Sequence, residues 1–461
     1  MITYIKINGF KSFHNFEMEF WPFTVIVGAN ASGKSNLFDA LKLLGRLAET
    51  DHLKKAFKEQ RGEFIELFTK LGENQYATEI TFAVEMLVNR TVTDAWGNEA
   101  ELNETRLRYE LKIKRFTNAL GIEDLAVTYE HLENVNHSED KWIQLLPKNG
   151  LENWHPKVKP GKRTIPYIKT EIEGGKPTVL VHQDGTQGGN HRRFPLNNAT
   201  RTVLSSFNTV DFPPVLIAKE EMRRWKFLQL NPKDLQQPTD KNIGDDVISE
   251  GGQNLAAVLY RIKQEDNYTL TEISRKFQTF LPDFVEVDVI DETENNQFLI
   301  KVIDKDKKEY TSRVLSEGTL RILALCILTY DNKHTGLLCF EEPENGIHPF
   351  RIETMAKLLK DLSVDFAEIE MPLRQVIVNT HSPALVAHIN RWQHDNNVSI
   401  WYAEMRNRVT DFQNKRVKLS ATSILPVMTE KTPLTLSFSE QEKKLTLSKI
   451  KKYLETASNQ S

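Results

Sequence analysis

The architecture of this chain follows from one short segment, Gly28-Ala29-Asn30-Ala31-Ser32-Gly33-Lys34-Ser35. An apolar run at residues 23–27 comes directly before it, and a helix-like run at residues 36–47 comes directly after it. The order is therefore strand, glycine loop and helix, with the spacing G-x-x-x-x-G-K-[ST] in the loop. The alternative is a glycine turn that carries Lys-Ser by chance, and the flanking strand and helix disfavour it.

The residue types in this loop suit a phosphate group. Two glycines let the backbone wrap around phosphate oxygens, so that N–H groups point at them, and the positive end of the following helix adds to the field. Lys34 would reach the β- and γ-phosphates of a nucleotide, and Ser35 would offer its hydroxyl to Mg²⁺. The nucleotide contacts expected in this segment are Gly28, Asn30, Ser32, Gly33, Lys34, Ser35 and Asn36.

The composition favours a globular protein with a sizeable core. The chain has 461 residues, of which 39% are hydrophobic and 27% charged, and its net charge is −3. This balance disfavours a surface that binds nucleic acid everywhere, but it leaves room for a local basic groove. Cys326 and Cys339 lie in apolar stretches and are expected to be small buried hydrophobic residues. With no signal-like start and no long apolar run, we expect a soluble, cytoplasmic protein without a membrane partner.

Two further buried strands are predicted to end in polar groups. Residues 336–340 form an apolar run that ends in Glu341-Glu342-Pro343-Glu344. This is the Walker B pattern, in which the first acid lies near Mg²⁺ and the second acts as general base on the attacking water. Residues 375–379 form another such run, which ends in Thr380-His381-Ser382-Pro383. Because open α/β sheets bind ligands at the carboxyl ends of their strands, His381 would contact the γ-phosphate rather than be only structural.

A second turn that suits an anion lies at Leu315-Ser316-Glu317-Gly318-Thr319, before an apolar helix predicted over residues 320–329. A serine N-cap alone would explain Ser316. A Ser and a Gly at a helix start also form an anion cradle. One chain does not need two cradles for one triphosphate. Two chains do, if each lends its second cradle to the nucleotide of the other.

Together these motifs resemble those of the ATP-binding-cassette-type ATPases of the SMC/RecF/OLD group. Residues 9–13, Gly-Phe-Lys-Ser-Phe, and the loop onward to residue 40 are similar to the opening of SMC heads. Residues 315–319 resemble the signature motif in its OLD-like spelling, residues 341–349 resemble Walker B with the D-loop, and residues 379–383 resemble the switch histidine. The resemblance extends to about residue 405, and residues 90–200 carry no motif of the group.

The resemblance implies an α/β fold: a P-loop head of the ABC type with a mixed sheet and helices, an antiparallel β lobe, and an inserted region rich in strands and loops. The residue pattern itself predicts a helical run at 51–70 with a break at Gly62, a strand at 142–146, loops around a β-hairpin at 149–198 and the start of a strand at 225–228. The region after the first helix has no heptad run, so no coiled-coil arm is expected there. The expected parts are the N-terminal half of the head at 1–90, the insertion at 91–235, the C-terminal half of the head at 236–405, and a tail with an amphipathic helix at 406–461.

The same resemblance implies an ATPase that uses ATP and Mg²⁺. Its catalytic residues would be Lys34, Glu342 and His381, and its metal ligands would be Ser35 and Glu341. Glu341 is one methylene longer than the usual aspartate, which suits contact with Mg²⁺ through a water. The implied assembly is a head-to-head homodimer, with higher oligomers left open, in which Ser316 and Gly318 of one chain close over the nucleotide of the other.

The resemblance also includes Gln60-Arg61-Gly62, which is similar to the arginine loop of SMC heads. Arg61 would then contact phosphate, the alternative being a surface arginine in a helix break. Gln60 is one candidate for the Q-loop glutamine of the group.

By analogy, we expect an ATP-driven conformational switch that is linked to DNA and controls a separate effector, a nuclease or toxin, in phage defence, or that acts in DNA repair. OLD proteins continue into a TOPRIM nuclease domain, but residues 382–461 contain no D-x-D pair, so a nuclease would be another polypeptide. The alternatives are a transporter's nucleotide-binding subunit, which Glu317 in place of glycine disfavours, and a slowly hydrolysing scaffold or sensor.

Two charged segments keep two interpretations each. The basic residues between Lys157 and Arg163, with Arg192-Arg193, form either a solvated face or a contact for nucleic acid or a partner. Ser439 and Glu442 predict a capping box for a helix that either packs on its own head or docks a partner.

Overall fold

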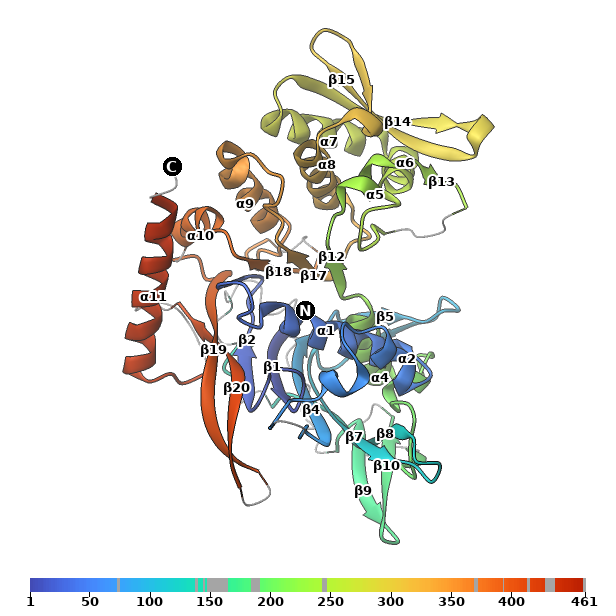
Figure 1. The fold of residues 1–461 in the computed structure, drawn as a ribbon. Coiled ribbons are helices and arrows are strands. Elements are labelled where there is room, and N and C mark those ends of the chain that lie inside the picture. Colours follow the sequence, from blue (N-terminus) through green and yellow to red (C-terminus); the bar gives the residue numbers. More distant parts are fainter. Residues whose placement is uncertain are drawn as a thin grey trace.

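A six-stranded sheet crosses the middle of the molecule in the computed structural model (Figure 1). From edge to edge its strands are β12 (Lys226–Leu228), β17 (Gly336–Glu341), β18 (Arg374–Thr380), β3 (Phe23–Val27), β19 (Val398–Phe412) and β20 (Lys415–Pro426). The first five are parallel, and β20 is antiparallel to β19. The structure describes residues 1–72, 75–136, 140–143, 146, 165–183, 191–242, 247–368, 372–392, 394–412, 415–427 and 436–458.

The central strands are apolar along their length because both of their faces are covered. Every residue of β3 and β18 is buried, and so is β17 up to its last residue, Glu341. The parallel register pairs Glu341 with Asn379 and Thr380 with Val27, so these strand ends lie level at one edge. The phosphate loop, the acids and the histidine therefore leave the sheet at the same edge.

Two hydrophobic cores meet at this sheet, one on each face. Successive side chains of β3 alternate between them, with Val25 and Val27 in one core and Ile26 in the other. Both cysteines are buried and unpaired as expected, and burial raises the pKa of the Cys326 thiol to about 12. The two faces are covered by different sets of elements.

An antiparallel sheet of eight strands lies below the central sheet in Figure 1. In spatial order it contains β11 (His191–Pro195), β10 (Lys176–His182), β9 (Ile168–Glu173), β8 (Glu123–Asn134), β7 (Arg106–Thr117), β4 (Glu79–Leu87), β1 (Ile2–Asn8) and β2 (Phe16–Glu19). A separate hairpin pairs β5 (Thr91–Thr93) with β6 (Glu99–Glu101). The hairpin expected within residues 149–198 is β9–β10.

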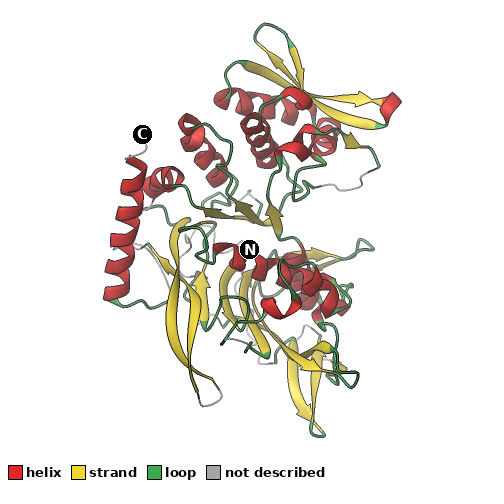
Figure 2. Ribbon diagram, viewed as in Figure 1, coloured by secondary structure: helices red, strands yellow, loops and turns green. Residues whose placement is uncertain are grey.

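An upper lobe combines a small antiparallel sheet with helices (Figures 1 and 2). Its strands are β13 (Thr239–Asp240), β14 (Phe284–Glu292), β15 (Gln297–Asp304) and β16 (Glu309–Thr311), and its helices are α5 (Pro232–Gln236), α6 (Leu255–Glu265), α7 (Asn267–Phe280) and α8 (Glu317–Tyr330). The predicted α/β class, a mixed sheet with helices and an antiparallel lobe, is confirmed.

The remaining helices lie around the central and lower sheets (Figure 2). They are α1 (Lys34–Glu49), α2 (Leu53–Lys58), α4 (Pro213–Arg223), α9 (Ile352–Asp361), α10 (Pro383–Ile389) and α11 (Glu440–Ser458). Short 3₁₀ turns cover Phe64–Leu67, Leu204–Ser206, Thr293–Asn295, Ser312–Val314, Pro349–Arg351 and Asn390–Trp392. Within the described ranges, no helix is both long enough and apolar enough to cross a membrane.

The tail helix α11 packs on its own head. Ile450 is 4% exposed and belongs to the core that contains Val25 and Val27. The predicted capping box is present, because Glu442 N donates to Ser439 Oγ at 3.2 Å and Ser439 N donates to Glu442 Oε2 at 3.0 Å. Of the two interpretations of the tail helix, the structure shows the one in which the helix packs on its own head.

One local expectation differs from the structure. A strand was expected over residues 142–146, but Trp142 lies in a turn, where its indole donates to Phe20 O at 3.0 Å and its ring stacks on Trp21. This aromatic residue packs instead of pairing in a sheet. The helical run expected over residues 51–70 has its break at Gly62, as predicted: α2 ends before this glycine, whose φ is 101°, and a 3₁₀ turn follows it. The basic residues from Lys157 to Arg163 lie outside the described residues.

Candidate nucleotide site

The phosphate loop connects β3 to α1. Gly33, the residue before the helix, has a φ of 88°, which favours glycine. Helix α1 begins without a side-chain cap and without an acidic residue in its first turn, so its first N–H groups and positive dipole end remain available to an anion. These features fit a bound phosphate.

The side chain of Lys34 folds back over this loop. Its Nζ donates to the carbonyl oxygens of Gly28 at 2.6 Å and Ala29 at 2.9 Å. Burial lowers the pKa of Lys34, while Glu342 and the nearby acids Glu341 and Glu344 act in the opposite direction. The lysine thus lies between the loop carbonyls and the acidic strand end.

Oxygen-bearing side chains from three elements converge beside α1. Ser35 Oγ donates to Glu341 Oε1, and Asn379 Nδ2 donates to Ser35 Oγ at 3.3 Å. Asn379 Oδ1 is buried and has no hydrogen-bond partner among the described residues. Hard oxygen ligands of this kind fit Mg²⁺. Asn379 was quoted as part of a motif but not as a site residue, because only the register of β17 with β18 places it beside Ser35 and Glu341.

Glu342 and His381 are neighbours across the ends of β17 and β18. His381 Nδ1 lies 2.8 Å from Glu342 Oε1, and Asn345 Nδ2 donates to Glu342 Oε2 at 2.8 Å. Glu342 has a φ of 49°, a left-handed conformation that costs a non-glycine residue about 1–3 kcal/mol. Its backbone N–H donates to Asn379 O at 2.8 Å, which holds the turn.

Glu344 lies next to this pair and is 8% exposed. Thr380 Oγ1 donates to one of its carboxyl oxygens, and the other is buried without a partner in the described part of the chain. Burial raises the pKa of Glu344. The third acid of the Walker B segment is therefore built into the turn, below the surface of the site.

Arg61 lies beside the phosphate loop. Its Nε donates to Asp39 Oδ1 at 3.0 Å, and its Nη2 donates to Ser35 O at 3.3 Å. Lys11 Nζ donates to Asp39 Oδ2 at 2.7 Å and to Arg61 O at 2.9 Å. Two cations from distant segments thus meet one carboxylate on α1, and the Arg61 side chain keeps 60% of its surface exposed.

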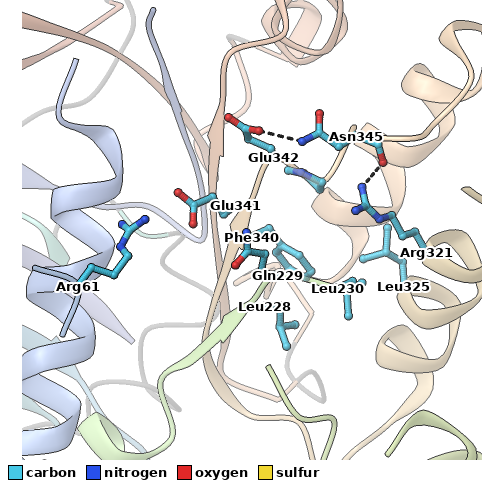
Figure 3. A pocket seen from close by; sticks show the side chains of 11 residues that line it. Arg61, Leu228, Gln229, Leu230, Arg321, Leu325, Phe340, Glu341, Glu342 and Asn345 are labelled. Atoms are coloured by element: carbon cyan, nitrogen blue, oxygen red, sulfur yellow. Dashed lines mark hydrogen bonds between the residues drawn. The ribbon is translucent and has the colours of Figure 1, made fainter. Parts of the chain in front are cut away.

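Two glutamines lie near this edge in different settings. Gln60 is 7% exposed, and its Nε2 donates to Ala56 O at 3.3 Å inside α2. Gln229 is exposed and follows β12, the parallel neighbour of β17. It lines a cavity of about 200 Å³ together with Arg61, Glu341 and Glu342. Figure 3 shows Arg61, Gln229 and Glu341 around this cavity. Gln229 was not among the residues predicted from the sequence, although a strand was expected to start at residues 225–228.

Ser316 and Gly318 lie at the start of α8. Ser316 is the N-cap of α8, and its Oγ accepts from Thr319 N at 3.2 Å. A Cβ on Gly318 would meet Gly346 O at 2.7 Å, so this glycine lets α8 pack against the segment after Walker B. Figure 1 shows α8 in the upper lobe and α1 in the lower half. Among the described residues, the contacts of these two residues are with Thr319 and Gly346 and not with the phosphate loop, although Arg321 of the same helix lines the cavity with Glu341 and Glu342.

The chain matches the family described as AAA ATPase domain over residues 1–386 and belongs to that family. It is therefore an ATP-binding ATPase, as the motifs predicted. No curated protein matches the chain in sequence.

The solved structures that are similar to this chain include three SMC heads. An SMC head bound to the C-winged helix domain of ScpA has 16% identity and a TM-score of 0.49, and the match covers 92% of this chain and 98% of that one. The SMC head domain from Thermotoga maritima has 14% identity and a TM-score of 0.39, with 93% and 99% covered. The Smc head with a coiled coil and joint from Pyrococcus yayanosii has 12% identity and a TM-score of 0.43, with 98% and 99% covered.

Proposed function

We propose that this chain hydrolyses ATP to ADP and phosphate at the loop Gly28–Ser35 and uses the cycle as a conformational switch. One observation carries the proposal: Ser35 and Glu341 are in hydrogen-bond contact, and Glu342 and His381 are in contact beside them, at one edge of a parallel sheet. Phosphoryl transfer needs positioned charge more than covalent chemistry, and this edge supplies both signs of charge.

The loop and the residues around it have separate proposed roles toward phosphate and Mg²⁺. The uncapped start of α1, the loop N–H groups and Lys34 would bind phosphate, with Asn30, Ser32 and Asn36 beside them and Arg61 at the rim. Ser35, Glu341 and Asn379 would hold Mg²⁺, with Gln229 facing the same space. The metal supplies neutralisation of charge on the phosphate oxygens. The residues named here would supply orientation.

Glu342 is the proposed general base. A base must have a free acceptor near the water it activates, and the two contacts to Glu342, from Asn345 and His381, fix the direction of its carboxylate. His381 would hold that carboxylate and contact the γ-phosphate. Loss of the γ-phosphate would then change the contact between His381 and Glu342.

A charge-neutral substitution tests this assignment. Glu342→Gln keeps the size of the side chain and removes the base, so turnover should fall at least about a hundredfold while ATP binding persists. The measurement is steady-state phosphate release together with ATP binding. If turnover of Glu342→Gln equals that of the wild type, Glu342 is not the base.

We further propose that two chains close over two nucleotides, each supplying Ser316 and Gly318 to the other. Support comes from the described contacts of these residues, which are with Thr319 and Gly346 and not with the loop of their own chain, and from exposed apolar side chains close to them in sequence: Val314, before Ser316, is 69% exposed, and Phe350, after Gly346, is 91% exposed. Mass measurement of Glu342→Gln with ATP should show a dimer. A dimer with negligible wild-type turnover would instead favour the scaffold or sensor.

The proposed output of the switch is control of a separate effector, such as a nuclease or toxin, in phage defence or DNA repair, with DNA as a second partner. This proposal follows the resemblance to the SMC/RecF/OLD group and not the chemistry of the site. Identifying what co-purifies with the tagged chain, and measuring ATPase activity with and without duplex DNA, would test it. No co-purifying effector and no response to DNA would count against it.

A further inference from the structure

The β19–β20 hairpin is in contact with the phosphate loop along one side. β19 pairs with β3 as far as Tyr402 opposite Val27, so the hairpin continues beside the loop. A Cβ on Gly28 would meet Ala403 O at 2.3 Å, and a Cβ on Gly33 would meet Thr422 Oγ1 at 1.8 Å. Both glycines of the loop therefore make room for this hairpin as well as for a phosphate.

A chain of hydrogen bonds connects Thr422 to the start of α1. Asn36 Nδ2 donates to Ser12 Oγ at 2.7 Å, and Ser12 Oγ lies 2.6 Å from Thr422 Oγ1. Thr422 Oγ1 lies 3.4 Å from Met405 Sδ, to which it donates. Each hydroxyl can then accept one hydrogen bond and donate one, provided that Ser12 donates to Thr422.

The backbone strengthens this connection. Thr422 N donates to Ser12 O at 2.9 Å, so the two residues are joined twice. Thr422 is 3% exposed, and a hydrogen bond shielded from water is costly to leave unmade. Three elements meet here: the β1–β2 loop, the first turn of α1, and β20. The hairpin lies beyond residue 386, where the match to the ATPase family ends.

We propose that Thr422 is a positioning residue of the nucleotide site, which holds the phosphate loop in its binding conformation through Ser12 and Asn36. The inference rests on the proposed ATP site at Gly28–Ser35. Because coupling between two sites is reciprocal, nucleotide binding at the loop must also stabilise the hairpin. The segment from β19 to β20 is thus a part of the site that responds to nucleotide.

The test removes one hydroxyl from the full-length protein. Thr422→Val keeps the shape and strand preference of the residue but breaks the hydrogen-bond chain, and the Kd for ATP with Mg²⁺ should rise about tenfold. The kcat at saturating ATP should stay within about twofold of wild type, because the catalytic residues are untouched. Thr422→Ser restores the hydroxyl and should restore the Kd.

A matched control lies two residues earlier on the same strand. Ser420 Oγ donates to Asn407 Oδ1 at 2.7 Å on the exposed hairpin, so Ser420→Ala also removes one hydroxyl contact and should leave the Kd unchanged. Hydrogen exchange gives a second readout. ATP should slow exchange of the amides in residues 398–427 of the wild type and have a smaller effect in Thr422→Val. Ser12→Ala breaks the same chain from the loop side and serves if Thr422→Val does not fold.

Lys34→Ala separates failure of this inference from failure of the proposed function. If Lys34→Ala loses ATP binding and Thr422→Val binds ATP as the wild type does, Thr422 is not a positioning residue. If Lys34→Ala itself binds ATP normally, the nucleotide site is placed wrongly and the proposed function fails with it. A raised Kd in both Thr422→Val and Ser12→Ala, with rescue by Thr422→Ser, supports the inference.

Discussion

Glu342 shows how single residues make this site. Its left-handed backbone turns the chain between Glu341, whose carboxylate contacts Ser35, and the segment that carries Asn345. Consecutive acids can then serve different partners, because the turn directs one toward α1 and the other toward His381. A backbone conformation that costs free energy persists here because the surrounding hydrogen bonds fix it.

The two glutamines provide a prediction at this scale. Gln229→Ala should lower kcat about tenfold, because it removes an amide from the cavity shared with Glu341 and Glu342. Gln60→Ala should leave kcat within about twofold, because Gln60 is 7% exposed and its amide donates to Ala56 O in α2, the helix before it. Steady-state turnover at saturating ATP distinguishes them. Equal losses in the two variants would contradict the assignment of Gln229.

At the scale of elements, α8 is fixed at both of its ends. Ser316 caps its N-terminus. At the other end, the buried guanidinium of Arg374 donates to the carbonyl oxygens of Leu328 at 3.0 Å, Asp331 at 2.9 Å and His334 at 2.7 Å. Orphan carbonyls at a helix end need such donors. Burial lowers the pKa of Arg374 to about 10, so the side chain remains charged at neutral pH.

Removal of this guanidinium should destabilise the protein. Arg374→Met leaves three buried carbonyl oxygens without their donor, and we expect a loss of about 2–4 kcal/mol in the free energy of unfolding. Arg391 is the control, because it forms an exposed ion pair with Glu353, and Arg391→Met should cost about 1 kcal/mol or less. Urea denaturation measures both. A loss in Arg374→Met no larger than in Arg391→Met would contradict the role given to Arg374.

At the scale of the whole molecule, the candidate nucleotide residues lie on two parts of the structure, the central sheet and the upper lobe. The loop, the acids and the histidine lie at the edge of the central sheet, whereas the turn with Ser316 lies on the upper lobe (Figure 1). Gly318 packs against Gly346, so the turn with Ser316 is in contact with the segment that follows Walker B. A second chain is the proposed source of the missing contact.

A bulky side chain at Ser316 tests that proposal. Ser316→Arg should bind ATP with a Kd within about threefold of wild type but should not dimerise in a Glu342→Gln background. Ser316→Asn keeps an N-cap and should dimerise. Mass measurement with and without ATP reports the result. A dimer that persists in Ser316→Arg would show that this turn is not the contact between chains.

Much of this site could be predicted because its motifs are contiguous. The spacing from Gly28 to Ser35, the acids after residues 336–340 and the histidine after residues 375–379 each lie within one strand and the turn that follows it. Local periodicity predicts such strands, and parallel strands bring their carboxyl ends to one edge. The same local reasoning failed at Trp142, where packing against Trp21 replaced strand pairing.

The sequence by itself determined the class of fold and the ATPase family, and it predicted the residues of the phosphate loop and Walker B segment. Only the tertiary structure placed Asn379 beside Ser35, Gln229 in the cavity, and Thr422 against Gly33. The physical reason is distance along the chain. Ser35 and Asn379 are separated by 344 positions, and Ser12 and Thr422 by 410, so their contacts depend on how whole sheets and hairpins pack. Local sequence patterns do not predict that packing.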